Sequence, residues 1–240
     1  MPNQQEKVKG VVDIVFLVDV TGSMGSCIEA LKNNISTFID VLTTQDANNS
    51  CPVKDWRARV VGYRDFEADS EPFVDQPFVA DASQLKSQLA LLKADGGGDE
   101  PESLLDALYK VISIGQTEKG AEPDPRKWRY RSSAARVVVV FTDASYKETM
   151  VIPEAKGGTY MDIANLAVND RIILSIFAPD MPCYDHLAEI DKSEYEAIPV
   201  DSDGPQKALE RYTADKEHFK KTLTQLARSV SKSAEAPPAL

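Results

Sequence analysis

The sequence has few of the residues that build zinc sites, disulfide frameworks and histidine-based catalytic sites. It contains two histidines and three cysteines in 240 residues. Cys27, Cys51 and Cys183 are odd in number and widely spaced, and no CxxC pair or cysteine–histidine spacing occurs, which argues against a zinc site or a disulfide framework. His186 and His218 are far apart in the sequence, and no serine or cysteine elbow lies near either of them, so we expect no catalytic role for them.

Positive charge and long apolar runs are also scarce. The 27 Lys and Arg residues stand against 38 Asp and Glu, for a net charge of −11, which argues against binding to nucleic acid or to an anionic membrane. No apolar run approaches the roughly 20 residues that span a bilayer. The first ten residues are polar and lack the apolar centre of a signal peptide. We therefore expect a folded, cytoplasmic protein.

Two apolar runs that end in an acid indicate central strands of a parallel sheet. Residues 11–20 and 136–143 are nearly continuous β-branched runs, as in strands buried on both faces, and they contain or end at Asp19 and Asp143. Further strands are expected at 59–63, 73–79, 172–177 and 195–200, of which 73–79 suits a short edge strand.

Segments with helical spacing of apolar residues alternate with these strands. Helices are expected at 28–42, 85–92, 104–112, 161–167 and 206–230, the last as one or two helices, and Asp81 or Ser83 can cap the second. The alternation predicts an α/β fold: a doubly wound, mostly parallel six-stranded sheet with one short antiparallel edge strand and helices on both faces. We place this domain at residues 11–231, between a flexible segment (1–10) and a disordered tail (232–240). Ligands of such sheets bind at the carboxyl ends of the strands, where Asp19 and Asp143 belong.

The first acid begins a motif that could hold a cation. Asp19-Val20-Thr21-Gly22-Ser23 puts one carboxylate and two hydroxyls on a tight loop before a helix, and Gly22 permits the turn between them. Because residues 19, 21 and 23 alternate, their oxygens can converge on one point, and oxygen ligands suit a hard cation such as Mg²⁺. The same residues could instead be a simple helix cap, since Ser and Thr favour that position.

The motif, with Met24, resembles the D-x-[ST]-G-S-M of von Willebrand factor type A domains, where it forms the first loop of the metal-ion-dependent adhesion site. Phe141-Thr142-Asp143 resembles the third loop, and the glycines at 96–98 stand where the second loop belongs. The resemblance covers about residues 11–230. It implies one Mg²⁺ or Mn²⁺ ion, held by Asp19, Thr21, Ser23, Asp99 and Asp143.

The second loop departs from the usual pattern of the family, which supplies a threonine there. This chain reads GGGDEPE over residues 96–102, similar to the G-G-G-D-x-P-E variant of hemicentin-like and alpha-kinase-associated members. Asp99 would then stand in the threonine position. A third carboxylate should raise the affinity for the cation and weaken its pull on an acidic ligand. Glu100 and Glu102 are expected to cap the following helix and to favour its positive end.

Three other features have weaker claims to a function. Asp65 follows a strand and is either an acid near the site or part of a salt bridge or turn. Cys27 is a packing residue rather than a reactive thiol. The basic loop 116–133, with Trp128 and Tyr130, either contacts a partner or is a solvated loop.

The resemblance implies a non-enzymatic, metal-dependent protein-interaction module acting inside the cell, whose partner completes the metal shell with an acidic side chain. The binding surface is expected to combine the metal with the loops 67–71, 116–133 and 145–158. One alternative is a scaffold whose metal is only structural. Another is a haloacid-dehalogenase-like, Mg²⁺-dependent phosphatase with Asp19 as the nucleophile. That enzyme pattern requires a second acid where this chain has Thr21, and a hairpin flap where this chain begins a helix.

Overall fold

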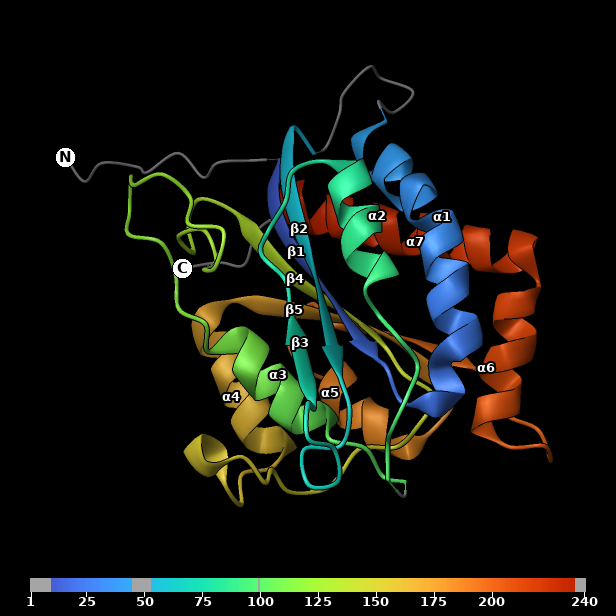
Figure 1. Ribbon diagram of the computed structural model, residues 1–240. Coiled ribbons are helices and arrows are strands. Elements are labelled where there is room, and N and C mark those ends of the chain that lie inside the picture. Colours follow the sequence, from blue (N-terminus) through green and yellow to red (C-terminus); the bar gives the residue numbers. More distant parts are fainter. Residues whose placement is uncertain (1–9, 45–52, 99, 236–240) are drawn as a thin grey trace.

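Six strands form one sheet in the order β3-β2-β1-β4-β5-β6 (Figure 1). The computed structural model describes residues 10–44, 53–98 and 100–235. Five strands run parallel to one another: β1 (Val11–Asp19), β2 (Asp55–Tyr63), β4 (Ala135–Phe141), β5 (Ile172–Pro179) and β6 (Glu194–Ile198). The edge strand β3 (Phe73–Asp75) runs antiparallel to β2. The predicted fold class is confirmed.

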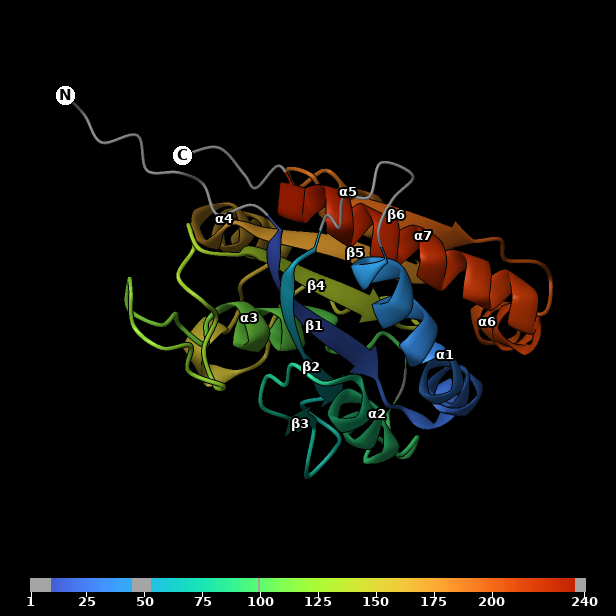
Figure 2. The same ribbon diagram turned by 90° about the horizontal axis from the view of Figure 1, so that it is seen from above.

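Helices cover both faces of the sheet. On one face lie α1 (Gly25–Thr43), α2 (Ala82–Ala90), α6 (Pro205–Ala214) and α7 (Lys216–Glu235), and on the other α3 (Leu104–Ile112), α4 (Tyr160–Asp170) and α5 (Asp185–Ala188) (Figures 1 and 2). Alternate side chains of β1 supply two separate cores: Phe16 packs under the first group of helices and Leu17 under the second. Within the described part of the chain, no helix has both the length and the apolar character needed to cross a bilayer.

The strand order reverses between β1 and β4. From β1 the chain continues outward to β2 on one side, whereas β4 leads to β5 on the other. Val18 of β1 pairs with Phe141 of β4, so that Asp19 is level with Thr142 and one residue from Asp143. The two sequence-predicted acids therefore lie together at the carboxyl edge, at the switch point where open α/β sheets bind ligands.

The bounds of several elements differ from those expected. Strand β2 begins at Asp55 rather than 59, because Arg57 finds a buried ion-pair partner in Asp13 of the neighbouring strand. Strand β3 ends at Asp75 rather than 79, before Pro77, whose ring nitrogen cannot donate to a strand. The four-residue α5 was not expected, and α7 continues to Glu235, beyond the domain end placed at 231. Asp81 caps α2 by accepting the amide hydrogens of Ser83 and Gln84.

Candidate functional site

Asp19 is a buried carboxylate whose orientation is fixed by two hydroxyl groups. Its exposed fraction is 0%. Oδ1 accepts hydrogen bonds from the Thr21 amide (2.9 Å) and the Thr21 hydroxyl (2.7 Å), and Oδ2 accepts one from the Thr142 hydroxyl (2.9 Å). Burial, followed by the negative charge of Asp143, raises the pKa of Asp19 to about 7 in spite of these hydrogen bonds. The site is thus built to hold a carboxylate whose charge is not compensated.

Asp143 is the second buried carboxylate, and neither of its oxygens has a hydrogen-bond partner among the described residues. The residue is 1% exposed. Burial raises its pKa, and the nearby hydroxyl of Ser23, in the turn Gly22–Met24 before α1, offsets part of that rise without reaching hydrogen-bond geometry. A buried carboxylate without partners is costly unless a cation compensates it. Asp143 therefore has the property expected of a residue that takes a metal ion.

A third carboxylate comes from the loop before α3, and it is Glu102. This side chain is 6% exposed, and its Oε2 has no hydrogen-bond partner among the described residues. Its pKa is raised to about 8 by burial and then by the charges of Asp19, Asp65, Asp143 and Asp69. The expected capping role is wrong for this residue, because α3 begins at Leu104 and makes no side-chain cap hydrogen bond. Asp99, the ligand that the sequence predicts in this loop, lies outside the described residues.

Two backbone hydrogen bonds hold Glu102 beside the loop of Asp143. The Glu102 amide donates to the carbonyl oxygen of Ser145 (2.8 Å), and the Lys147 amide donates to the carbonyl oxygen of Glu102 (2.9 Å). Gly97, at φ +83°, lies against the opposite side, where a Cβ atom would come within 2.9 Å of Thr21 and 3.3 Å of Glu102 Oε1. A side chain at 97 would therefore enter the space between the first and second loops.

Asp65 belongs to an ion-paired group at the rim. Its carboxylate accepts hydrogen bonds from Lys147 Nζ (2.7 Å), the Glu67 amide (2.8 Å) and the Ser103 hydroxyl (3.3 Å). Burial alone would raise its pKa, but these donors, Lys147 first, hold the pKa below the ordinary value. Asp65 has both of the roles open for it: it makes the salt bridge and the turn, and its charge also reaches Glu102 at the site. Lys147 also bonds Glu67 at 2.7 Å, so its charge is shared between two acids at the rim.

The arrangement suits an ion that uses hydroxyl and water ligands as well as carboxylates. No three His, Cys, Asp or Glu side chains in the described part of the chain are placed to hold a metal ion by themselves. The Thr21 hydroxyl gives its hydrogen to Asp19, which leaves its lone pairs free for a cation. Mg²⁺ characteristically binds one or two carboxylates and retains several waters.

A solved structure shares this architecture. A von Willebrand factor type A from Catenulispora acidiphila aligns with 93% of this chain and with 43% of its own length, at a TM-score of 0.52 and 14% identity. The chain has the fold of a von Willebrand factor type A domain. At this identity the likeness concerns the fold alone.

The curated relatives are larger proteins. An alpha-protein kinase of Dictyostelium discoideum, vwkA, is 27% identical over 133 residues, which is 55% of this chain and 18% of the kinase. A protein described as an ariadne-like RING finger protein, from Acanthamoeba polyphaga mimivirus, is 27% identical over 106 residues, or 44% of this chain and 10% of its own length. This chain thus spans less than a fifth of either relative. No known family profile matches it.

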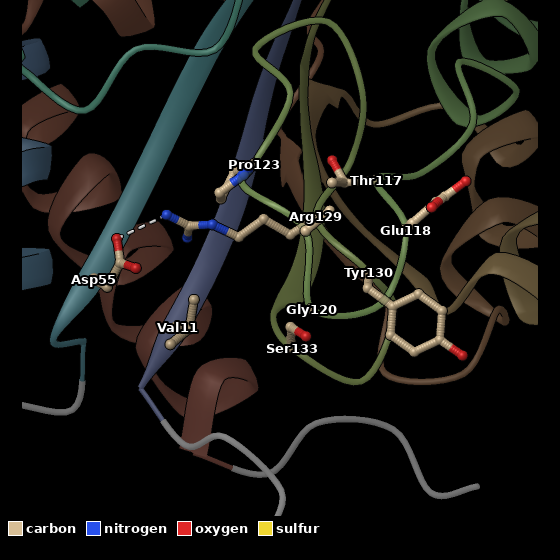
Figure 3. Close-up of a pocket in the computed structure, with 10 residues that line it drawn as sticks. Val11, Asp55, Thr117, Glu118, Gly120, Pro123, Arg129, Tyr130 and Ser133 are labelled. Atoms are coloured by element: carbon tan, nitrogen blue, oxygen red, sulfur yellow. Dashed lines mark hydrogen bonds and ion pairs between the residues drawn. The ribbon is translucent and has the colours of Figure 1, made fainter.

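The basic loop 116–133 lies at the opposite, amino edge of this von Willebrand type A fold, so its expected place beside the metal is wrong (Figure 3). It connects the end of α3 to the start of β4, and topology therefore carries it away from Asp19. Trp128 is fully buried and donates its indole hydrogen to the Val111 carbonyl oxygen (3.1 Å). Arg129 crosses a hollow of about 260 Å³ to pair with Asp55 at 2.8 Å. These side chains fix the loop to the sheet.

Cys27 lies near two of the three acids, whereas the two histidines pack against aromatic rings. Cys27 is fully buried in α1, and burial, followed by the charges of Asp143 and Asp19, raises the pKa of its thiol, which fits the expected packing role. His186 stacks on Tyr160 with ring centroids 4.6 Å apart, and His218 meets the edge of Tyr212 at 4.4 Å.

Proposed function

We propose that the chain binds one divalent cation, Mg²⁺ or Mn²⁺, at the carboxyl edge of its sheet and uses it to engage an acidic side chain of a protein partner. The main support is Asp143, whose two buried oxygens lack partners beside a second buried carboxylate. A cation would turn this costly pair of charges into a stabilising site. Ser23, which is exposed at the same edge, would leave one side of the ion open to a partner.

The proposed ligands are Asp19, Thr21, Ser23 and Asp143, together with an acid of the loop before α3. Asp99 remains a candidate from the sequence. Glu102 is the stronger candidate, because it is buried, lacks a partner for Oε2 and interacts electrostatically with both central acids. Since no three acids among the described residues are placed to hold an ion together, Glu102 would contact the ion through water. When bound, the ion would supply a positive centre that coordinates oxygen ligands.

Neither competing function gains comparable support. A phosphatase nucleophile must reach its substrate, whereas Asp19 is fully buried and both of its oxygens accept hydrogen bonds. We therefore propose a non-enzymatic role, and turnover of a phosphate ester that disappears in Asp19→Asn would contradict it. A purely structural metal is opposed by the exposure of Ser23. The cytoplasmic location remains a prediction of the sequence.

Calorimetric titration with Mg²⁺ should give one site per chain, and Glu102→Gln should weaken it by about tenfold or more, since it removes a buried acid beside the ion. Glu100→Gln is the matched control. Glu100 is exposed two residues away, its carboxylate accepts the Ser145 amide hydrogen (3.1 Å), and its charge is only the last of the causes that act on the pKa of Asp143, so its variant should change Mg²⁺ affinity much less than Glu102→Gln does. Loss of binding in Asp99→Ala with no change in Glu102→Gln would assign the ligand to Asp99 instead.

Stabilisation by Mg²⁺ should grow as the pH rises through neutrality. The folded chain holds Asp19 at a pKa of about 7 and Glu102 at about 8, above their ordinary values of 3.8 and 4.5, so the metal-free folded state binds more protons than the unfolded state between these limits. Its free energy of unfolding therefore falls with rising pH across that window. Protons also compete with the ion, so the shift in melting temperature caused by Mg²⁺ should be larger at about pH 8.5 than at about pH 5.5. An equal shift at both pH values would contradict the assignment.

A further inference from the structure

An apolar hollow of about 590 Å³ adjoins the three acids at the same edge of the sheet. Ser145 lines it, and Ser145 lies two residues after Asp143, so the wall of the hollow is within about 7 Å of the site along the chain. Pro101, which immediately precedes Glu102, lines it as well. The hollow and the candidate metal site therefore share two loops and form one continuous surface.

Aromatic contacts fix the shape of this hollow. The Tyr146 hydroxyl donates to the Cys183 carbonyl oxygen (2.6 Å), which ties the loop after β4 to the loop after β5. Tyr160 and His186 stack with their planes 13° apart. All four residues line the hollow, so it is preformed and would not need to be ordered by a ligand.

Apolar side chains are also left exposed next to the hollow. Met161, which lines it, is 58% exposed, and Val168 on the same helix is also 58% exposed. Two of the four large apolar side chains that the described residues leave exposed thus belong to α4. Seven residues separate them, so they share one face of the helix. This apolar strip begins at the hollow and runs away from the metal site.

Charge around the site defines what an occupant must carry. When Asp19, Asp143 and Glu102 are all ionised, a divalent ion leaves this edge with a net charge of −1, so coordination of a partner's acid cannot supply most of the binding energy. The rim of the hollow adds Glu148, and the neighbouring loop adds the exposed Glu100, while no Lys or Arg is among the lining residues. A binding segment must therefore gain affinity from apolar contact and from positive charge.

We propose that the hollow receives an aliphatic or aromatic anchor of a basic protein segment, whose acidic residue, two to four positions away, binds the metal ion. This inference rests on the proposed metal-dependent function. The spacing of two to four residues follows from the reach of an extended chain, about 3.3 Å per residue, between the metal site and the neighbouring hollow. The segment's basic residues face Glu100 and Glu148, and its continuation covers Met161 and the strip on α4.

Panning random dodecapeptides on phage against the immobilised, Mg²⁺-loaded chain, with elution by EDTA, tests this inference. The eluted peptides should share an acid, an apolar residue two to four positions away and an excess of Lys or Arg. A synthetic peptide of that sequence should lose about tenfold or more in affinity when its apolar anchor becomes Ala, because one large apolar side chain is no longer buried.

Met161→Asp should produce a similar loss, and Leu91→Asp is the matched control. Leu91 is 60% exposed at the end of α2, on the other face of the sheet. Both positions are exposed, an acid in the first turn of α4 suits the helix dipole, and an acid at the exposed C-terminal end of α2 is only mildly unfavourable, so both variants should fold. EDTA-eluted peptides that bind Met161→Asp as tightly as the wild type would overturn this inference and leave the metal-dependent function intact. Recovery of no EDTA-dependent peptide would overturn both.

Discussion

Replacing Asp143 with asparagine is expected to abolish stabilisation by Mg²⁺ and, at the same time, to make the metal-free protein more stable. The carboxylate is 1% exposed, and neither of its oxygens has a hydrogen-bond partner among the described residues. Without an ion it is an uncompensated buried charge, and its charge is the second cause of the raised pKa of Asp19. The isosteric amide removes that charge and leaves the shape of the site unchanged.

The substitution should raise the stability of the metal-free protein and lower its affinity for Mg²⁺. This combination distinguishes a metal ligand from a residue with a purely structural role. The free energy of unfolding of the metal-free variant should rise by about 1 kcal/mol or more at neutral pH, since an unsatisfied charged group is costly to bury. Its affinity for Mg²⁺ should fall by at least about 100-fold, because even outer-shell changes cost 10- to 100-fold. Denaturant unfolding with and without Mg²⁺ measures the first effect, and calorimetry measures the second. A variant that is less stable without metal and still binds Mg²⁺ would show that Asp143 is structural.

Local patterns were sufficient to predict the central strands and the first and third loops of the site. Residues 11–20 and 136–143 are apolar on both faces, as a central parallel strand requires. The positions of the acids at their ends follow from these strands alone, without knowledge of any contact distant in the sequence. Parallel pairing alone then brought Asp19 and Asp143 to one edge. Where strand and helix periodicity were strong, the elements were found to within a few residues.

The features that local patterns failed to predict depend on contacts between residues distant in the sequence. Glu102 was expected to cap a helix, and the sequence did not predict its burial. That burial depends on backbone hydrogen bonds with Ser145 and Lys147, more than 40 residues later in the chain. The only local signal was its position after Pro101, close to three glycines that allow near approach. Loop 116–133 was placed beside the metal on the strength of its length, although a loop that leads into the start of a parallel strand lies at the amino edge.

Charged residues inside strands were the other source of error. Strand β2 was expected to start at 59, yet the four residues before it also belong to the strand, and both Arg57 and Arg59 are buried. Arg57 pairs with Asp13, 44 residues earlier, and Arg59 pairs with Asp75 at 2.7 Å. No local sequence pattern predicts either ion pair. The acid within the first apolar run, Asp13, thus has a partner that only the fold supplies.

Asp13→Ala is expected to destabilise the protein strongly and to leave Mg²⁺ binding unchanged. Asp13 is 0% exposed, and its two oxygens accept hydrogen bonds from Arg57 Nε (2.8 Å) and Nη2 (2.7 Å). The Arg129 amide donates to the same carboxylate at 2.7 Å. Loss of the carboxylate leaves the buried Arg57 guanidinium without its counter-charge, which costs about 3–5 kcal/mol. The melting temperature should fall by on the order of 10 °C for a domain of this size.

Asp13 and Asp19 make a matched pair, because both are fully buried acids on β1 and lie about 20 Å apart, six residues at about 3.3 Å each. Asp13→Ala should therefore retain one Mg²⁺ per chain in calorimetry, whereas Asp19→Ala should lose it. The double variant Asp13→Ala, Arg57→Met should recover part of the lost stability, since it removes both buried charges together. If the double variant is less stable than the sum of the two single changes predicts, the pair does not act as a compensated unit. Loss of Mg²⁺ binding in a folded Asp13→Ala protein would show instead that the two ends of β1 are coupled.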